Sequence, residues 1–332
     1  MKKKFFWSIV LTMLLLTSGC FKKGSSDIST TVLNKLNNLK NYHLTGQLEI
    51  INNEDRYQYA VDVSYLKDDN FRVSLKNKTN DHEQIILKNK EGVFVLTPSL
   101  NKSFKFQSDW PYNSSQSYIL QSVYKDLKNT KEKDVKEEKE GYVITTAISY
   151  TNNEQLKAQK LYVDKKGNLK KVEVYDKDNQ IKMTMNFEKI DYKASFEKSY
   201  FEVNQNMSVF SEIMEPSNKK IEDIIYPMYL PENTHLTSED KVSIENGERV
   251  ILTFDGDYPF MLVEETAQPE NEFVTIPVYG DLELLADTIA TVTDNSVTWT
   301  SNGIEYYAVS ETLETAELLE IVKSISTMPV GK

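Results

Sequence analysis

Hydrophobic residues follow two different periods along the chain. Over Ile28 to Leu39 they recur at three- and four-residue spacing on a polar background, which predicts one amphipathic helix. From Tyr42 onward they alternate with polar residues, which is typical of strands that bury one face. A second helix is predicted over Ser114 to Leu127, in the middle of this run of strands. The predicted strands cover residues 42–50, 57–65, 71–75, 84–87, 92–96, 103–106, 142–150, 159–163, 169–175 and 181–188.

Short connections rich in Asn, Asp, Gly and Pro join these strands, and the segment from Asp164 to Asn168 is a hairpin turn. Connections of this length favour antiparallel neighbours. The charged run from Lys131 to Lys139 is predicted to be a solvated loop or a strand end. The pattern predicts an α+β fold in which a strongly curved antiparallel sheet wraps around helices with its apolar face inward.

The last third of the chain has its own strands and its own closing helix. It opens with Ile225 to Glu232, and Asn302-Gly303 marks a tight turn after a strand that carries Trp299. A helix is predicted over Thr315 to Ser326, and its apolar stripe is expected to pack on a sheet rather than to bind a partner. This region is predicted to be a smaller α+β domain.

The first twenty residues combine a basic start, a short apolar run and a cysteine. Three lysines precede the apolar run Phe5 to Leu16, which is too short to span a bilayer and ends at Thr17-Ser18-Gly19-Cys20. This resembles a bacterial lipoprotein signal. The resemblance implies cleavage before Cys20, a diacylglycerol on its thiol, and a location on the extracytoplasmic face of the cytoplasmic membrane. The alternatives are an ordinary signal peptide with a free cysteine and an uncleaved anchor.

Charge divides the exported part of the chain. The whole sequence of 332 residues carries a net charge of −11, which argues against a nucleic-acid partner. Residues 20–211 hold 26 acidic and 30 basic side chains, whereas the residues from Glu212 onward hold 24 acidic and 6 basic ones. The predicted organisation is a signal peptide at 1–19, a tether at 20–27, a first domain at 28–205, a linker at 206–222 and a second domain at 223–332.

Two segments carry a resemblance to a known superfamily. They are the opening Leu39-Lys40-Asn41-Tyr42-His43-Leu44-Thr45-Gly46 and the hairpin from Leu161 to Leu169. With the order of elements, they make residues 28–205 similar to the LolA and RseB superfamily, whose fold is an unclosed β-barrel with helices as a lid. In overall plan the chain also resembles the GerS-like germination and sporulation lipoproteins of Gram-positive spore formers. In that group the sheet has become a scaffold that binds a cell-wall amidase.

The sequence offers no compact set of residues for catalysis. His43, His82 and His235 are scattered, and none stands in a spacing typical of a zinc site. Asp255-Gly256-Asp257 is predicted to be a turn between strands rather than a cation loop. We therefore expect no catalytic residues, no metal, no cofactor and no enzymatic activity. Cys20 is the one candidate with a defined role, as the lipid anchor.

Strand parity suggests which side chains face the inside of the curved sheet. If that interior is open, it is an apolar cavity able to accept acyl chains. If it is filled, these residues are simply core. The candidate cavity residues are Tyr59, Val61, Val63, Phe71, Val73, Phe94 and Leu96.

Two classes of function follow from these patterns and resemblances. The favoured hypothesis is a membrane-anchored, non-enzymatic scaffold that binds a protein partner in sporulation, germination or maintenance of the cell envelope. The alternatives are a tethered protein that binds acyl chains or lipoproteins, as LolA does, and an RseB-like sensor that contacts a transmembrane regulator.

Overall fold

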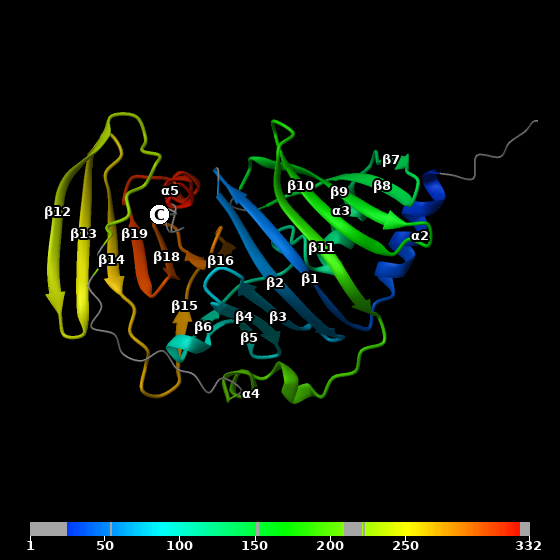
Figure 1. Cartoon of the computed structure of the whole chain (residues 1–332), viewed down its shortest axis with the longest axis horizontal. Helices are drawn as coiled ribbons and strands as arrows, with labels where there is room; N and C mark the ends of the chain where they lie inside the picture. The colour runs from blue at the N-terminus through cyan, green and yellow to red at the C-terminus, as the bar shows by residue number, and fades with distance from the viewer. Residues whose placement is uncertain (1–24, 54, 151–152, 209–220, 222, 326–332) are drawn as a thin grey trace, which may run out of the picture.

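A computed structural model describes residues 25–53, 55–150, 153–208, 221 and 223–325. It contains two sheets, a large curved one and a smaller one beside it (Figure 1). The predicted α+β class is confirmed: a curved, unclosed sheet with helices is followed by a smaller sheet with its own helix. No helix within the described ranges is long and apolar enough to cross a membrane.

The first region follows the predicted order of elements closely. Its helices are α2 (Ser25–Asn37), α3 (Leu120–Asn129) and α4 (Val203–Ser208), with short 3-10 turns η1 (Pro98–Leu100) and η2 (Lys198–Phe201). Its strands are β1 (Asn41–Asn52), β2 (Asp55–Leu66), β3 (Asn70–Asn77), β4 (Glu83–Asn89), β5 (Gly92–Thr97), β6 (Lys102–Phe106), β7 (Asp134–Glu137), β8 (Gly141–Ala147), β9 (Leu156–Asp164), β10 (Leu169–Asp176) and β11 (Ile181–Asp191).

The helix predicted from Ser114 begins six residues later than expected. The preceding residues are buried but not helical, because their polar side chains bind elsewhere. The hydroxyl of Ser115 donates to Asp126 Oδ1 over 2.9 Å, and the hydroxyl of Tyr118 donates to Gln116 Oε1 over 2.8 Å. These contacts hold residues 114–119 as an irregular segment in the core.

The second region supplies eight strands and one helix among the described residues. The strands are β12 (Thr234–Ile244), β13 (Gly247–Gly256), β14 (Phe260–Thr266), β15 (Val274–Val278), β16 (Asp281–Leu284), β17 (Ile289–Val292), β18 (Ser296–Ser301) and β19 (Ile304–Val309), and the helix is α5 (Thr315–Lys323). The predicted turn at Asn302-Gly303 is confirmed, whereas of the predicted turn Asp255 to Asp257 only Asp257 lies between the strands, because Asp255 and Gly256 end β13 and pair with β12. Asn302 and Gly303 both have positive φ, as a tight hairpin requires.

One strand of the second region completes the sheet of the first. The large sheet runs β15-β6-β5-β4-β3-β2-β1-β11-β10-β9-β8-β7, and β15 pairs in parallel with β6, which places Ile276 beside Phe104. The expected antiparallel pairing is correct for the pairs among β1–β11, whereas β15 was not among the predicted strands and adds in parallel. The linker predicted at 206–222 lies largely outside the described residues, so the domain bounds stay a prediction.

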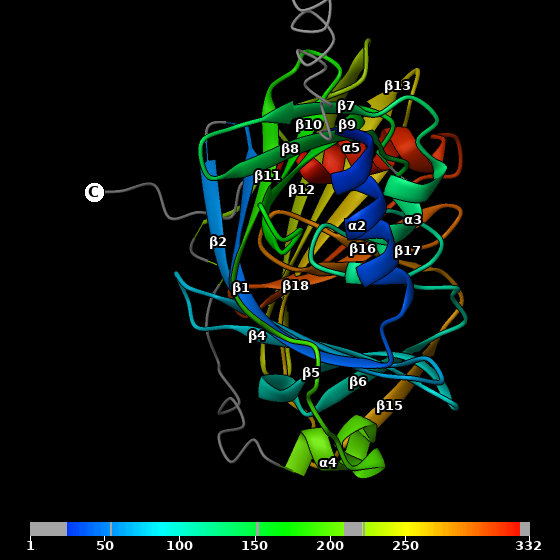
Figure 2. The ribbon, with the colours of Figure 1, turned by 90° about the vertical axis from the view of Figure 1, so that its right-hand side faces the viewer.

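The concave side of the large sheet is filled by the chain itself. Figure 2 shows α2 and α3 lying within its curve. Trp110, Tyr118 and Val123 are at most 2% exposed in the same core as the inward side chains of β1–β3. Leu282 and Ile289 of the second region also join this core. Side chains from both regions therefore fill the interior of the half-barrel.

The smaller sheet runs β12-β13-β14-β19-β18-β17-β16 and is covered on one face. As predicted, α5 packs on that face through its apolar stripe, with Leu318 and Leu319 fully buried. The segment before β12 lies across the same core. The N–H of Ile225 donates to Glu264 Oε1 over 2.9 Å, and the N–H of Tyr229 donates to Ser324 Oγ over 3.0 Å.

Candidate functional site

Five of the seven predicted cavity residues lie together inside the half-barrel. Tyr59, Val61, Val63, Phe71 and Val73 belong to the core beneath α2 and α3, and each is at most 3% exposed. They pack against Trp110 and its neighbours, so the structure places them in a filled core.

Phe94 and Leu96 lie on the opposite face of the sheet, which is a correction to the sequence interpretation. They form a separate cluster with Ile85 and Leu87, against which Met207 of α4 packs. On β5 it is Val93 and Val95 that point into the half-barrel. A shift of one residue in a strand moves the side chain to the other face, and the short apolar strand β5 gives no polar alternation to fix its parity.

Cys20, the predicted lipid anchor, lies outside the described residues, as does the tether around it. Its role stays a prediction that rests on the sequence.

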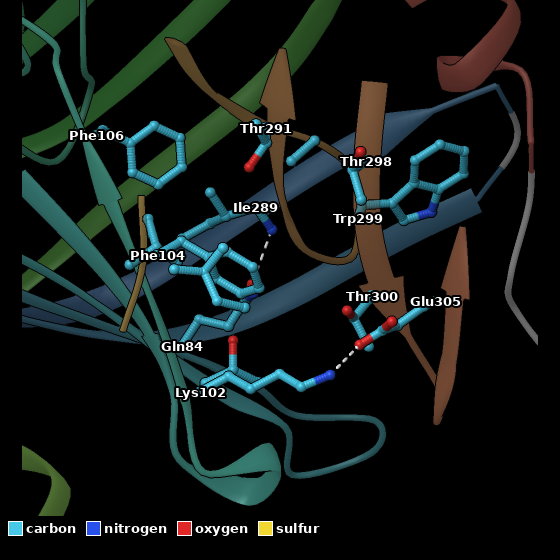
Figure 3. Close-up of a pocket in the computed structure, with 14 residues that line it drawn as sticks. Gln84, Lys102, Phe104, Phe106, Ile289, Thr291, Thr298, Trp299, Thr300 and Glu305 are labelled. Atoms are coloured by element: carbon cyan, nitrogen blue, oxygen red, sulfur yellow. Dashed lines mark hydrogen bonds and ion pairs between the residues drawn. The ribbon is translucent and has the colours of Figure 1, made fainter. Parts of the chain in front are cut away.

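The structure does hold a cavity, at the junction of the two sheets. Its volume is about 110 Å³. Figure 3 shows Phe104 and Phe106 on one side and Thr291 and Thr298 on the other, with Ile289 between them. Ile276 of β15 lines it as well. The addition of β15 to β6 thus builds one wall of a site that neither sheet forms alone.

Buried polar contacts bind the two regions together around this cavity. Gln84 Oε1 accepts hydrogen bonds from the hydroxyl of Thr288 over 2.9 Å and from the N–H of Ile289 over 2.8 Å. Lys102 Nζ lies 2.7 Å from Glu305 Oε1, and the Lys102 side chain is only 10% exposed (Figure 3). Because a buried donor or acceptor without a partner is costly, these pairs fix the relative position of the sheets.

A second cavity, of about 280 Å³, lies further along the same junction. Asn52 and Gln155 of the first region line it, together with Leu284 of the second. The Nδ2 of Asn52 donates to the carbonyl of Lys323 over 2.7 Å. The hydroxyl of Tyr59 donates to the carbonyl of Ala286, another residue that lines this cavity, over 2.8 Å. Hydrogen bonds between the two regions therefore lie beside the second cavity as well.

The ionisable groups that burial perturbs are spread over the molecule. Burial raises the pKa of Asp126 to about 6, against the hydrogen bond from Ser115, and raises the pKa of Glu264 to about 7. Burial also lowers the pKa of His82, although Asp287 opposes that shift. Over the part of the chain that the structure describes, no three potential metal ligands cluster.

The fold is that of a two-region α+β protein, in which a large curved sheet is half-closed around two helices and a smaller sheet is bound at its edge. Residues 1–201 match the model of the YdcC-like sporulation protein family. The chain belongs to that family.

Several known proteins are similar to this chain. The chain is 32% identical over 318 residues to the sporulation protein YdcC of Bacillus subtilis strain 168, a match that covers 95% of this chain and 94% of that protein. Among solved structures, the crystal structure of MucB covers 91% of this chain and 98% of its own at 15% identity and a TM-score of 0.35. A LolA superfamily protein from Nitrosomonas europaea covers 54% of this chain and 98% of its own, with 10% identity and a TM-score of 0.32. The predicted resemblance to sporulation proteins is confirmed.

Proposed function

We propose that this chain is a non-enzymatic binding scaffold, anchored to the extracytoplasmic face of the membrane through a lipid on Cys20. Its role is to hold a protein partner during sporulation or germination, or in the cell envelope. The chain belongs to a family of sporulation proteins, which supports a role in sporulation. The observation that carries the mechanism is the filled half-barrel, because a chain that occupies its own interior binds through its surface.

The filled interior also separates this proposal from its alternative. An acyl chain needs an apolar cavity with room for a hydrocarbon tail. Here the inward side chains of β1–β3 contact Trp110, Tyr118 and α3 instead, and Tyr59 binds the backbone of the second region at Ala286. These contacts favour a protein partner over an acyl ligand. A transmembrane regulator is one kind of partner that the proposal includes.

The experiment uses the full chain in sporulating cells. Wild type and Cys20→Ala are expressed with a C-terminal tag, cells are treated with an amine-reactive cross-linker, and the tagged species are resolved by mass. We expect the wild-type chain in the membrane fraction, cross-linked to one protein of defined mass, and the Cys20→Ala chain uncleaved or released, without that cross-link.

Two outcomes would contradict the proposal. A Cys20→Ala chain that is processed normally and stays in the membrane would show that Cys20 is not the lipid anchor. A wild-type chain that forms no protein cross-link, yet releases a stoichiometric lipid on organic extraction, would make it an acyl-chain binder.

A further inference from the structure

The uncovered face of the smaller sheet carries one continuous row of side chains. In the antiparallel ladders, Ile251 of β13 lies opposite Val263 of β14, and Val263 lies opposite Tyr307 of β19. Tyr307 in turn lies opposite Thr298 of β18, and Thr298 lies opposite Thr291 of β17. Residues directly opposite in an antiparallel sheet point to the same face. We call these five residues the cross-strand row.

The cross-strand row faces away from the core. Its neighbours in sequence, such as Leu262, Tyr306 and Val297, are at most 2% exposed and pack on the side of α5. Tyr307 itself is 41% exposed, and Met261 in the next row is 38% exposed. Large apolar side chains are therefore at the surface in one place, where exposed apolar patches often mark interaction sites.

One end of the row enters the cavity at the junction. Thr291 and Thr298 belong both to the row and to the lining of the 110 Å³ cavity, whose other wall is Phe104, Phe106 and Ile276. Strands in a sheet lie about 4.8 Å apart, so five strands give a track of roughly 19 Å. That track is long enough for five or six extended residues, ending in a hollow of the size that takes one aliphatic side chain.

The charge around the track is mainly negative. Asp255 of β13, Glu265 of β14 and Glu305 of β19 lie on the same face as the row. The basic groups at the flank are already paired, Arg249 with Glu265 and Lys102 with Glu305. At the far end, Asp240 of the edge strand β12 lies opposite Ile251. A ligand that follows the track therefore meets exposed carboxylates and gains from carrying positive charge.

We propose that the cross-strand row and the cavity at its end form the docking track for a basic segment of the partner protein, whose leading aliphatic side chain fills the cavity. This rests on the scaffold function proposed above and adds where the partner binds and what chemistry it carries. The apolar row and cavity fix the position of the segment, and the acidic surroundings raise its rate of encounter.

The test uses three fluorescent 12-residue peptides and the purified full chain. The first repeats Lys-Lys-Val four times, the second replaces every Lys by Glu, and the third replaces every Val by Ser. We expect the first peptide to bind about ten-fold or more tightly than either other peptide by fluorescence anisotropy, which corresponds to about 1.4 kcal/mol. Its affinity is expected to fall as salt is raised.

Two substitutions locate the peptide. Tyr307→Ser should weaken binding of the Lys-Lys-Val peptide by about ten-fold. Tyr258→Ser is the matched control, because Tyr258 is 40% exposed in the same region but lies in the turn between β13 and β14. If Tyr307→Ser and Tyr258→Ser bind the Lys-Lys-Val peptide with equal affinity, the track is not the binding site. If the Lys-Lys-Val and Lys-Lys-Ser peptides bind with equal affinity, the binding is non-specific charge attraction and the valines do not contribute to it.

A photo-cross-linking residue separates failure of this inference from failure of the proposed function. It is placed in the full chain at Tyr307, at Tyr258 or at Tyr112, and the cells are irradiated during sporulation. A basic, Val- or Leu-containing partner segment captured from Tyr307 alone supports the track. Capture from Tyr112 alone leaves the scaffold function standing and overturns the track, and no capture from any position overturns both.

Discussion

The two sheets differ in how many of their faces they bury. The large sheet covers its concave face with α2, α3 and residues 107–119, and η2 and α4 lie over part of its convex face. The smaller sheet buries the face under α5 and leaves the cross-strand row partly exposed, with Thr298 and Tyr307 the most exposed. The division of charge follows the same line, since the exposed face belongs to the acidic region. The comparison teaches that the large sheet is packed on its concave face and on part of its convex face, whereas the second region leaves part of one sheet face open to solvent.

The largest effect is expected from emptying the core of the large sheet. Trp110 has 0% exposure, and its ring lies edge to face on Phe71 with centroids 5.8 Å apart. Trp110→Ala should lower the free energy of unfolding by about 3 to 5 kcal/mol, measured by urea denaturation. Tyr279→Ala, at a side chain 76% exposed, is the control and should stay close to wild type. A loss below about 1 kcal/mol for Trp110→Ala would mean that the half-barrel is not tightly filled.

The next largest effect on the free energy of unfolding is expected from Glu264, the buried carboxyl of the smaller sheet. Burial raises the pKa of Glu264 to about 7, from an ordinary value near 4.5. The folded state then holds the proton more tightly than the unfolded state, so the stability that protonation gives is complete below about pH 4.5 and is lost as pH rises through about 7. Glu264→Gln, which stays neutral, should therefore stabilise the chain by about 2 to 3 kcal/mol at pH 8 and have little effect at pH 4.5.

Thermal or urea unfolding at the two pH values checks this. Glu265→Gln, on the exposed face of the same strand, controls for the removal of a carboxylate. A gain from Glu264→Gln that is equal at both pH values would show that the benefit comes from packing rather than from the charge.

Strand positions could be predicted from the sequence because alternation in a sheet with one buried face is strong. β1, β2 and β3 begin and end within two residues of the predicted runs. The closing helix and the turn at Asn302-Gly303 could also be predicted, because each is determined by residues close together in the sequence.

What the sequence did not reveal was long-range pairing. β15 is a five-residue strand containing Pro277, and nothing near it in sequence indicates that it pairs with β6, about 170 residues earlier. The cavity depends on that pairing, so its residues could not be identified from periodicity. Phe94 and Leu96 were misplaced for a related reason, since every residue of β5 after Gly92 is buried and the strand has no exposed positions to set its parity.

A smaller effect is expected at the junction of the two sheets. Gln84→Leu removes the acceptor for the N–H of Ile289 and the hydroxyl of Thr288, and a buried donor left without a partner costs about 1 to 3 kcal/mol. In wild type, limited proteolysis should cut first within 206–222, and the two fragments should co-elute in gel filtration because β15 and Gln84 hold them together. The Gln84→Leu fragments should separate at lower urea.

Gln58→Leu is the matched control for Gln84→Leu, because Gln58 lies on the exposed face of β2. Fragments of the nicked wild-type chain that separate without denaturant would show that the two regions are independent units joined only by the linker.

The smallest effect is expected from Tyr307 on the exposed face, and its neighbour Tyr306 on the buried face gives the contrast. Tyr306 is 2% exposed and its ring stacks on Trp299 with centroids 4.9 Å apart, whereas Tyr307 is 41% exposed. Tyr306→Ser should cost about 3 kcal/mol or more of unfolding free energy, and Tyr307→Ser should change it by about 0.5 kcal/mol or less. Urea denaturation of both variants measures the difference. If Tyr307→Ser destabilises as much as Tyr306→Ser does, the row contributes to the fold, and its exposure would no longer indicate a surface kept for a partner.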